Sequence, residues 1–111
     1  TGMPNTAIYA ASKAALNSYT RTAATELAPK KIRVNSVNPG PIYTPIFGKT
    51  GMAEDQLNEF AEIVRNRVPL KRFGQPDEIA KLVTFLASDD ASFITGSEYN
   101  IDGGININPI M

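Results

Sequence analysis

The chain has 111 residues, of which 42% are hydrophobic and 20% are charged, as in ordinary globular proteins. Its 11 basic and 11 acidic residues give a net charge of zero, which argues against nucleic acid as the main partner because neutralising phosphates needs a basic excess. The chain contains neither Cys nor His, which excludes disulfides, a thiol nucleophile, Cys-based zinc sites and histidine chemistry. Any proton transfer must use Tyr, Lys, Asp or Glu.

The sequence shows no targeting segment. Residues 1–5 lack a charged region followed by an apolar run, and no stretch approaches the roughly 18 apolar residues needed to span a bilayer. The absence of Cys suits a reducing compartment, so we expect a cytoplasmic protein that does not bind membranes. A start at Thr1 rather than Met indicates a processed, cut or partly recorded chain.

Residues 8–28 are the first predicted element. The segment is rich in Ala and free of Gly and Pro, which favours a helix that ends at Pro29. Its small side chains would let another element approach closely. The β-branched run 32–37 then predicts a strand, which the breakers of residues 38–41 should end.

Residues 53–67 carry apolar side chains on one stripe, which predicts an amphipathic helix. Pro76 suits the first position of another helix, which runs to about Ser88 and carries acidic residues in its first turn. Because this helix is apolar on most sides, we expect it to be largely buried. Residues 97–101 predict a second strand, which ends at the Gly pair 103–104.

The order helix, strand, helix, helix, strand predicts an α/β fold with a parallel sheet. Two strands do not complete such a sheet, because it needs neighbours at its edges and cover on both faces. We therefore expect more chain on the N-terminal side, or a partner that supplies strands. Without internal repeats, residues 1–111 form a single segment.

Tyr9 and Lys13 lie four residues apart on the first predicted helix, and so they share a face. A cation near a phenol favours the phenolate, which lets a Tyr donate or accept a proton at a carbonyl or alcohol oxygen. A chance pair on an exposed helix face is the alternative interpretation of this spacing alone.

Residues 34–44 carry a strand into a Pro-Gly turn that ends at Thr44. In open α/β sheets, ligands bind beyond the carboxyl ends of the strands. Gly40 permits close backbone approach, and the Thr44 hydroxyl offers a polar contact to a carboxamide or phosphate oxygen. By itself the segment is also compatible with an ordinary turn.

In combination these motifs resemble the short-chain dehydrogenase/reductase family. The matching residues are Tyr9-x-x-Ser12-Lys13, Ile32-Arg33-Val34-Asn35, Asn38-Pro39-Gly40, Thr44, Arg72-Phe73-Gly74-Gln75-Pro76-Asp77-Glu78, Phe85-Leu86-Ala87-Ser88-Asp89, Thr95-Gly96 and Ile101-Asp102-Gly103-Gly104. The resemblance spans residues 1–104 and implies the C-terminal part of a Rossmann-type doubly wound sheet.

The resemblance also implies roles for individual residues. Tyr9 would be the catalytic acid/base and one of the cofactor-binding residues, and Lys13 would tune Tyr9 and hold the ribose hydroxyls of NAD or NADP. The turn that packs on the nicotinamide would consist of Pro39, Gly40, Ile42 and Thr44, with the Ile42 backbone and the Thr44 hydroxyl near the carboxamide. Residues 45–68 would form the variable substrate-binding region, and residues 102–104 a structural strand end near a subunit interface.

Other parts of the family's site are missing from this sequence. The eight glycines never form the spacing of a phosphate-binding loop, so the Gly-rich nucleotide-binding half is absent. The family's catalytic Ser and Asn would lie upstream of Thr1, together with the residue that selects NAD or NADP.

Three other candidates carry weaker signals. Asp89-Asp90 suggests a metal site or, more simply, a solvated helix end, and we expect no metal. Residues 30–33 suggest an anion patch or a solvated loop. Tyr43 and Phe47 either line a substrate pocket or cover the core.

The sequence thus leads to two hypotheses and leaves open a third, a family member that has kept the fold and lost activity, against which the intact Tyr9–Lys13 pair argues. In the first, the parent protein is an oxidoreductase that moves a hydride between a nicotinamide cofactor and a carbonyl or alcohol substrate, as a homodimer or homotetramer. In the second, the 111-residue chain is a structural or self-associating fragment without activity.

Overall fold

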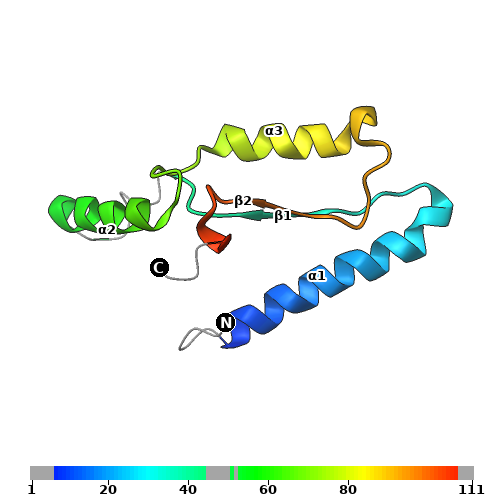
Figure 1. Ribbon diagram of the computed structural model, residues 1–111, viewed down its shortest axis with the longest axis horizontal. Helices are drawn as coiled ribbons and strands as arrows, with labels where there is room; N and C mark the ends of the chain where they lie inside the picture. The colour runs from blue at the N-terminus through cyan, green and yellow to red at the C-terminus, as the bar shows by residue number, and fades with distance from the viewer. Residues whose placement is uncertain (1–6, 45–50, 52, 108–111) are drawn as a thin grey trace. The chain divides into compact units, whose positions relative to one another are not determined.

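The computed structural model describes residues 7–44, 51 and 53–107, and it divides into two compact units. The first unit comprises residues 1–37 and 83–99, and the second comprises residues 38–82 and 100–111. Figure 1 follows the elements along the chain by colour.

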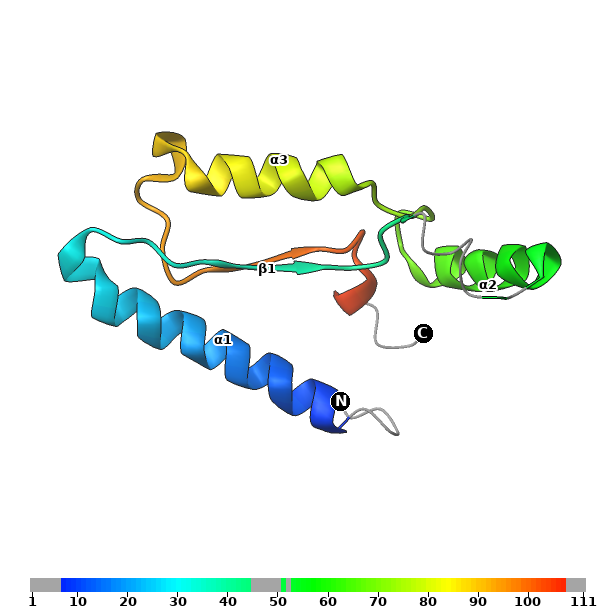
Figure 2. The same ribbon diagram turned by 180° about the vertical axis from the view of Figure 1, so that it is seen from behind.

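Helix α1 (Ala7–Leu27) belongs to the first unit and confirms the first predicted helix. Thr20, Ala23 and Ala24 are its buried residues. A Cβ atom added at Gly96 would lie 3.5 Å from the Ala24 Cβ, so the small side chains do allow a close neighbour. Arg21 also donates to Glu98 at 2.6 Å. Figures 1 and 2 both show α1 beside the segment around residues 96–98, which belongs to the same unit.

Strands β1 (Ser36–Pro39) and β2 (Glu98–Ile101) pair in a two-stranded parallel sheet, which confirms the predicted α/β class. At either end of the pair, the Ser36 N–H donates to the Ser97 carbonyl and the Gly40 N–H donates to the Ile101 carbonyl, both at 3.0 Å. The pairing joins segments some sixty residues apart in sequence.

The predicted bounds of the first strand, residues 32–37, were wrong, because β1 begins at Ser36 and continues through Pro39. Before Ser36, side-chain hydrogen bonds join the two segments together with a backbone bond from the Gly96 N–H to the Val34 carbonyl at 2.7 Å. The Val34 N–H donates to the Thr95 hydroxyl, and the Asn35 amide donates to the Ile94 carbonyl while accepting from the Ser97 N–H. A β-branched run indicates extended chain, but it does not reveal which backbone groups find a strand partner.

Helix α2 (Glu54–Arg67) confirms the second predicted helix and lies in the second unit. None of its residues is buried, and the structure describes all of them. The chain leaves α2 at Val68, whose side chain is only 1% exposed. The centre of the second unit is therefore at the end of this helix rather than along its apolar stripe.

Helix α3 (Pro76–Ala87) confirms the third predicted helix, but the expectation that it is largely buried was wrong. Among its residues, all of which the structure describes, only Leu86 is buried, while Val83 and Phe85 are each more than 40% exposed. A sheet of two strands offers surface for only a narrow stripe of a helix. The apolar composition of a helix does not show how much partner surface is available.

The Gly pair after β2 packs against the end of α2 within the second unit. The Leu70 N–H donates to the Gly103 carbonyl at 3.2 Å. Gly103 has a φ of +63°, and a Cβ atom there would lie 2.5 Å from the Val68 Cγ1. Only Gly meets both the backbone conformation and the space at this position.

A bidentate ion pair joins Arg72 to Glu78 at the start of α3. The guanidinium donates to the two carboxylate oxygens at 2.8 and 3.0 Å, and the Gln75 N–H donates to the Glu78 Oε1 at 2.9 Å. The hydrogen bonds from Arg72 and then from Gln75 lower the pKa of Glu78 from its ordinary 4.5 to about 2. This group of contacts is called the Arg72–Glu78 clamp below.

Gly103→Ala should destabilise the protein that contains this chain by roughly 2–4 kcal/mol, because it adds a collision with Val68 to the cost of a left-handed backbone. Gly51→Ala is the matched control. Gly51 has a φ of +78° with open space around it, so only the backbone cost of about 1–2 kcal/mol applies. Urea denaturation of the two variants measures both losses. Equal losses would contradict the importance of the contact with Val68.

The Glu78 carboxyl should titrate near pH 2 in an NMR titration, and Arg72→Gln should raise its pKa toward 4.5. The pKa of Glu78 in this variant should stay below 4.5, because the Gln75 N–H still donates to the carboxylate. Since the folded pKa is the lower one, the stabilisation is complete above about pH 4.5 and is lost as the pH falls toward 2. Lys81→Gln is the control, because the effect of Lys81 on Glu78 is the smallest of those acting on this carboxyl. An unaltered protein in which Glu78 titrates at 4.5 would refute the clamp.

Candidate functional site

The first set of site residues consists of Tyr9 and Lys13 on α1, in the first unit. The Lys13 Nζ lies 5.8 Å from the centre of the Tyr9 ring, because residues four apart on a helix are neighbours on the same face. Tyr9 is 64% exposed, and Lys13 is half-buried. The Ser12 hydroxyl donates to the Tyr9 carbonyl at 2.7 Å. The helix thus presents a phenol with an adjacent cation and leaves the phenol accessible to a ligand.

The second set consists of Pro39, Gly40, Ile42 and Thr44, in the second unit. Gly40 is tightly enclosed: a Cβ atom there would lie 2.5 Å from the Asp102 Cβ and 2.6 Å from its Cα. The sequence interpretation assigned Gly40 to close approach of a ligand. In the structure the neighbour that requires Gly at this position is Asp102.

Residues 41–43 form a turn that is hydrogen-bonded to Gly74. The Gly74 N–H donates to the Pro41 carbonyl and the Tyr43 N–H donates to the Gly74 carbonyl, both at 2.9 Å, which makes a parallel bridge between Ile42 and Gly74. A Cβ atom at Gly74 would lie 2.7 Å from the Ile42 Cδ1. Sequence reasoning described Gly74 only as part of a turn and missed this partnership.

The bridge determines which way the Ile42 backbone faces. In a parallel bridge of this kind, the two neighbours of the bridge residue bond to the partner segment. The N–H and C=O of the bridge residue itself point to the opposite side. Within the described part of the chain, the N–H and C=O of Ile42 have no hydrogen-bond partner. They are therefore available to a ligand, and the half-buried Thr44 follows two residues later.

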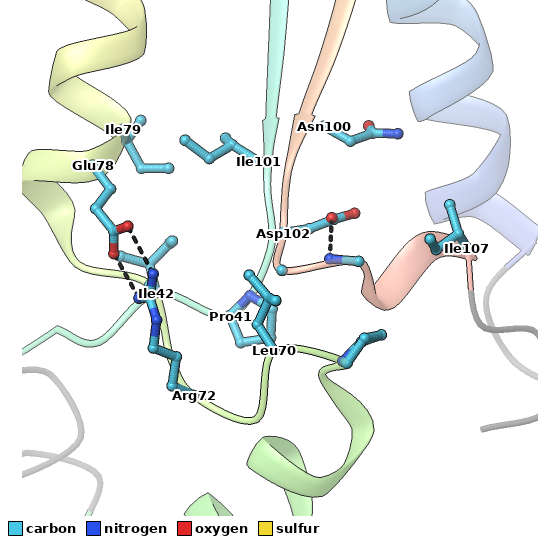
Figure 3. A pocket seen from close by; sticks show the side chains of 14 residues that line it. Pro41, Ile42, Leu70, Arg72, Glu78, Ile79, Asn100, Ile101, Asp102 and Ile107 are labelled. Carbon is cyan, nitrogen blue, oxygen red and sulfur yellow. Dashed lines mark hydrogen bonds and ion pairs between the residues drawn. The ribbon is translucent and has the colours of Figure 1, made fainter.

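A cavity of about 610 Å³ lies beside this turn, and all of its lining residues belong to the second unit. Figure 3 shows Pro41 and Ile42 in its wall, with the Arg72–Glu78 pair on one side and Asp102 on the other. The Asp102 Oδ1 accepts from the Gly104 N–H at 2.9 Å. Its Oδ2 is buried without a partner among the described residues. The rest of the wall is mainly apolar.

The remaining candidates have local explanations. Asp89 and Asp90 are exposed in a 3₁₀ turn (Asp89–Ala91), where the Ser88 hydroxyl accepts from the Asp90 N–H. Arg33 donates to the carbonyls of Ser88 and Ile94, so it ties segments of the first unit together. Tyr43 is largely exposed, whereas Phe47 lies outside the described residues.

Two further findings concern metals and membranes. Over residues 7–44, 51 and 53–107, no group of three or more acidic residues comes together that would hold a metal ion. In the same ranges, no helix combines the length and the apolar character that crossing a membrane requires.

The sequence is similar to a known family and to known proteins. The family described as enoyl-(acyl carrier protein) reductase matches residues 1–106. The chain is 46% identical over 106 residues to a 3-oxoacyl-[acyl-carrier-protein] reductase of Thermotoga maritima, and the match covers 96% of this chain and 41% of that protein.

Solved structures agree with the sequence comparison. A short-chain dehydrogenase family protein of Francisella tularensis superposes with a TM-score of 0.81 at 36% identity, over 96% of this chain and 46% of that one. L-sorbose reductase of Gluconobacter frateurii, solved with NADPH and L-sorbose, superposes with a TM-score of 0.78 at 37% identity, over 89% of this chain and 40% of that one.

The chain thus spans less than half the length of the relatives that it matches. The fold, the order of the motifs and the match over residues 1–106 agree with one another. The chain belongs to the short-chain dehydrogenase/reductase family and corresponds to its C-terminal portion.

Proposed function

We propose that the protein containing this chain transfers a hydride between NAD or NADP and a carbonyl or alcohol carbon. The observation that carries the proposal is the Tyr9–Lys13 pair, with the Lys13 Nζ 5.8 Å from the ring centre on a helix that leaves the phenol exposed. The relatives support the reaction class, because one is named as an oxoacyl reductase and another was solved with NADPH and a sugar substrate.

Tyr9 is the acid/base of this mechanism. In the reductive direction, its hydroxyl donates a proton to the carbonyl oxygen while the carbon receives the hydride that the bound cofactor supplies. In the oxidative direction, the phenolate accepts the proton from the alcohol. In this proposal the Lys13 ammonium, one helical turn from Tyr9, donates to the ribose hydroxyls of the cofactor. Because the chain contains no His, no imidazole of this chain competes for the acid/base role.

The turn after β1 holds the nicotinamide end of the cofactor in this proposal. Its support is the Ile42 backbone, whose N–H and C=O are unpaired among the described residues. A carboxamide has one donor group and one acceptor, so it complements these two groups. Pro39 and Gly40 shape the approach to this turn, and the Thr44 hydroxyl contributes a further polar contact.

The substrate is a small carbonyl or alcohol compound. Its selection belongs to residues 45–68, of which 45–50 and 52 lie outside the described residues. Ketoacyl, sugar, steroid and small alcohol substrates all fit the reaction class. The homodimer or homotetramer and the cytoplasmic location stay predictions.

A second candidate function applies to the 111-residue chain by itself. None of its glycines forms a phosphate-binding loop, and the chain covers only about two fifths of the Thermotoga maritima relative. Large apolar side chains such as Ile8 and Phe93 are almost fully exposed in the structure. An isolated chain of this kind would be a self-associating structural module without catalysis.

Tyr9→Phe in the full-length protein should lower turnover by about 10²- to 10⁴-fold, because it removes the proton that general acid catalysis supplies. The dissociation constant of the cofactor should change little, since the ring and Lys13 remain. Tyr19→Phe is the matched control, as Tyr19 is an equally exposed phenol on the same helix at 68%. Steady-state kinetics and cofactor fluorescence measure both effects. Undiminished turnover in Tyr9→Phe would refute the mechanism.

The intact denatured mass of the natural protein decides which of the two functions applies. A mass near 12.0 kDa identifies the isolated chain, which should then neither bind NADH in the micromolar range nor turn over a carbonyl substrate. A mass about twice as large or more identifies a complete domain and favours the enzyme. Micromolar NADH binding by the 12.0 kDa chain, measured by fluorescence titration, would contradict the structural module.

A further inference from the structure

We propose that Arg72 and Glu78 are positioning residues for the cofactor. Through Gly74 they hold the turn of residues 41–43 in the place where its Ile42 backbone meets the nicotinamide end. The inference rests on the proposed function, because it names the part of the chain that orients the same turn. All of the residues concerned lie in the second unit.

The ion pair between Arg72 and Glu78 has a directional geometry. Two parallel N–H···O bonds of 2.8 and 3.0 Å join the guanidinium to the carboxylate, and such a fork restricts both side chains to one relative orientation. A partly exposed ion pair contributes little to global stability. Its directional geometry nevertheless makes it suitable for holding a short segment.

The Arg72–Glu78 pair also binds the backbone that flanks Gly74. The Arg72 guanidinium also donates to the Phe73 carbonyl at 3.1 Å, and the Glu78 Oε1 accepts from the Gln75 N–H at 2.9 Å. Glu78 is the third residue of α3, from which an acidic side chain can reach back to the N–H before the helix. The clamp therefore restrains the backbone on both sides of Gly74.

Gly74 in turn binds the backbone of residues 41–43. Gly74 exchanges two hydrogen bonds of 2.9 Å with Pro41 and Tyr43, and a Cβ atom at Gly74 would lie 2.7 Å from the Ile42 Cδ1. Figure 3 shows Ile42 next to the Arg72–Glu78 pair in the wall of the cavity. A displacement of Gly74 would thus be transmitted to the Ile42 backbone.

The decisive comparison uses two ligands that differ only in the nicotinamide. Glu78→Gln, introduced into the full-length protein, removes the ionic fork. It should weaken binding of the reduced dinucleotide about tenfold, which is the size of one lost charge-assisted hydrogen bond. Binding of the matching ADP-ribose should change less than about twofold, because this ligand lacks the nicotinamide that the turn of residues 41–43 would contact. Isothermal titration calorimetry measures both constants.

Two further variants complete the comparison. Asp77→Asn is the matched control, because Asp77 precedes Glu78 in the same helical turn but pairs with Lys81 on the surface; both ligands should bind it normally. Arg72→Lys keeps the charge and loses the fork, so it should show the same selective loss to a smaller extent. If Glu78→Gln does not fold, Arg72→Lys carries the comparison.

Amide hydrogen exchange provides a readout that needs no cofactor. The Tyr43 N–H donates to the Gly74 carbonyl, so Glu78→Gln should speed its exchange more than Asp77→Asn does. The inference would be overturned if Glu78→Gln weakened the binding of both ligands equally or of neither. Unchanged exchange of the Tyr43 amide would also overturn it. Failure of the proposed function differs from these results, because the unaltered protein would then bind no dinucleotide.

Discussion

The pairing of β1 with β2 is the constraint on which the rest of the structure depends. It joins two short strands some sixty residues apart in sequence. Asn35 extends the pairing at one end, because its amide bonds to the Ile94 carbonyl and to the Ser97 N–H. Gly40 extends it at the other end, where its missing side chain makes room for Asp102. The contacts of Asn35 lie in the first unit, and the contact of Gly40 with Asp102 lies in the second.

The site residues depend on this pairing to different degrees. Tyr9 and Lys13 meet through the periodicity of one helix, so their juxtaposition needs no distant contact. The turn of residues 41–43 instead acquires its shape from Gly74, which belongs to a segment thirty residues later. The pair proposed for acid/base chemistry therefore forms within one helix, while the surface proposed to receive the nicotinamide depends on long-range packing. The Arg72–Glu78 clamp connects that surface to the start of α3.

Several elements could be predicted because the signal is local. Helix α1 followed from Ala content without breakers, and α3 followed from Pro76 with acidic residues in the first turn. The predicted bounds of β1 were wrong because the Val34 and Ser97 N–H groups bond to the Thr95 and Asn35 side chains, where a regular ladder would use backbone carbonyls. The predicted burial of α3 was wrong because a sheet of two strands is too narrow to cover Val83 and Phe85, which stay exposed.

The sequence by itself determined the family, the α/β class, the order of the elements and the Tyr9–Lys13 pair. All of these follow from short-range spacing or from the order of motifs along the chain. Only the tertiary structure decided that Gly40 packs on Asp102, that Gly74 bridges to Ile42, and that Arg72 reaches Glu78. The physical reason is that close approach and hydrogen-bond direction depend on segments that meet in space, and residue types alone do not encode which segments meet.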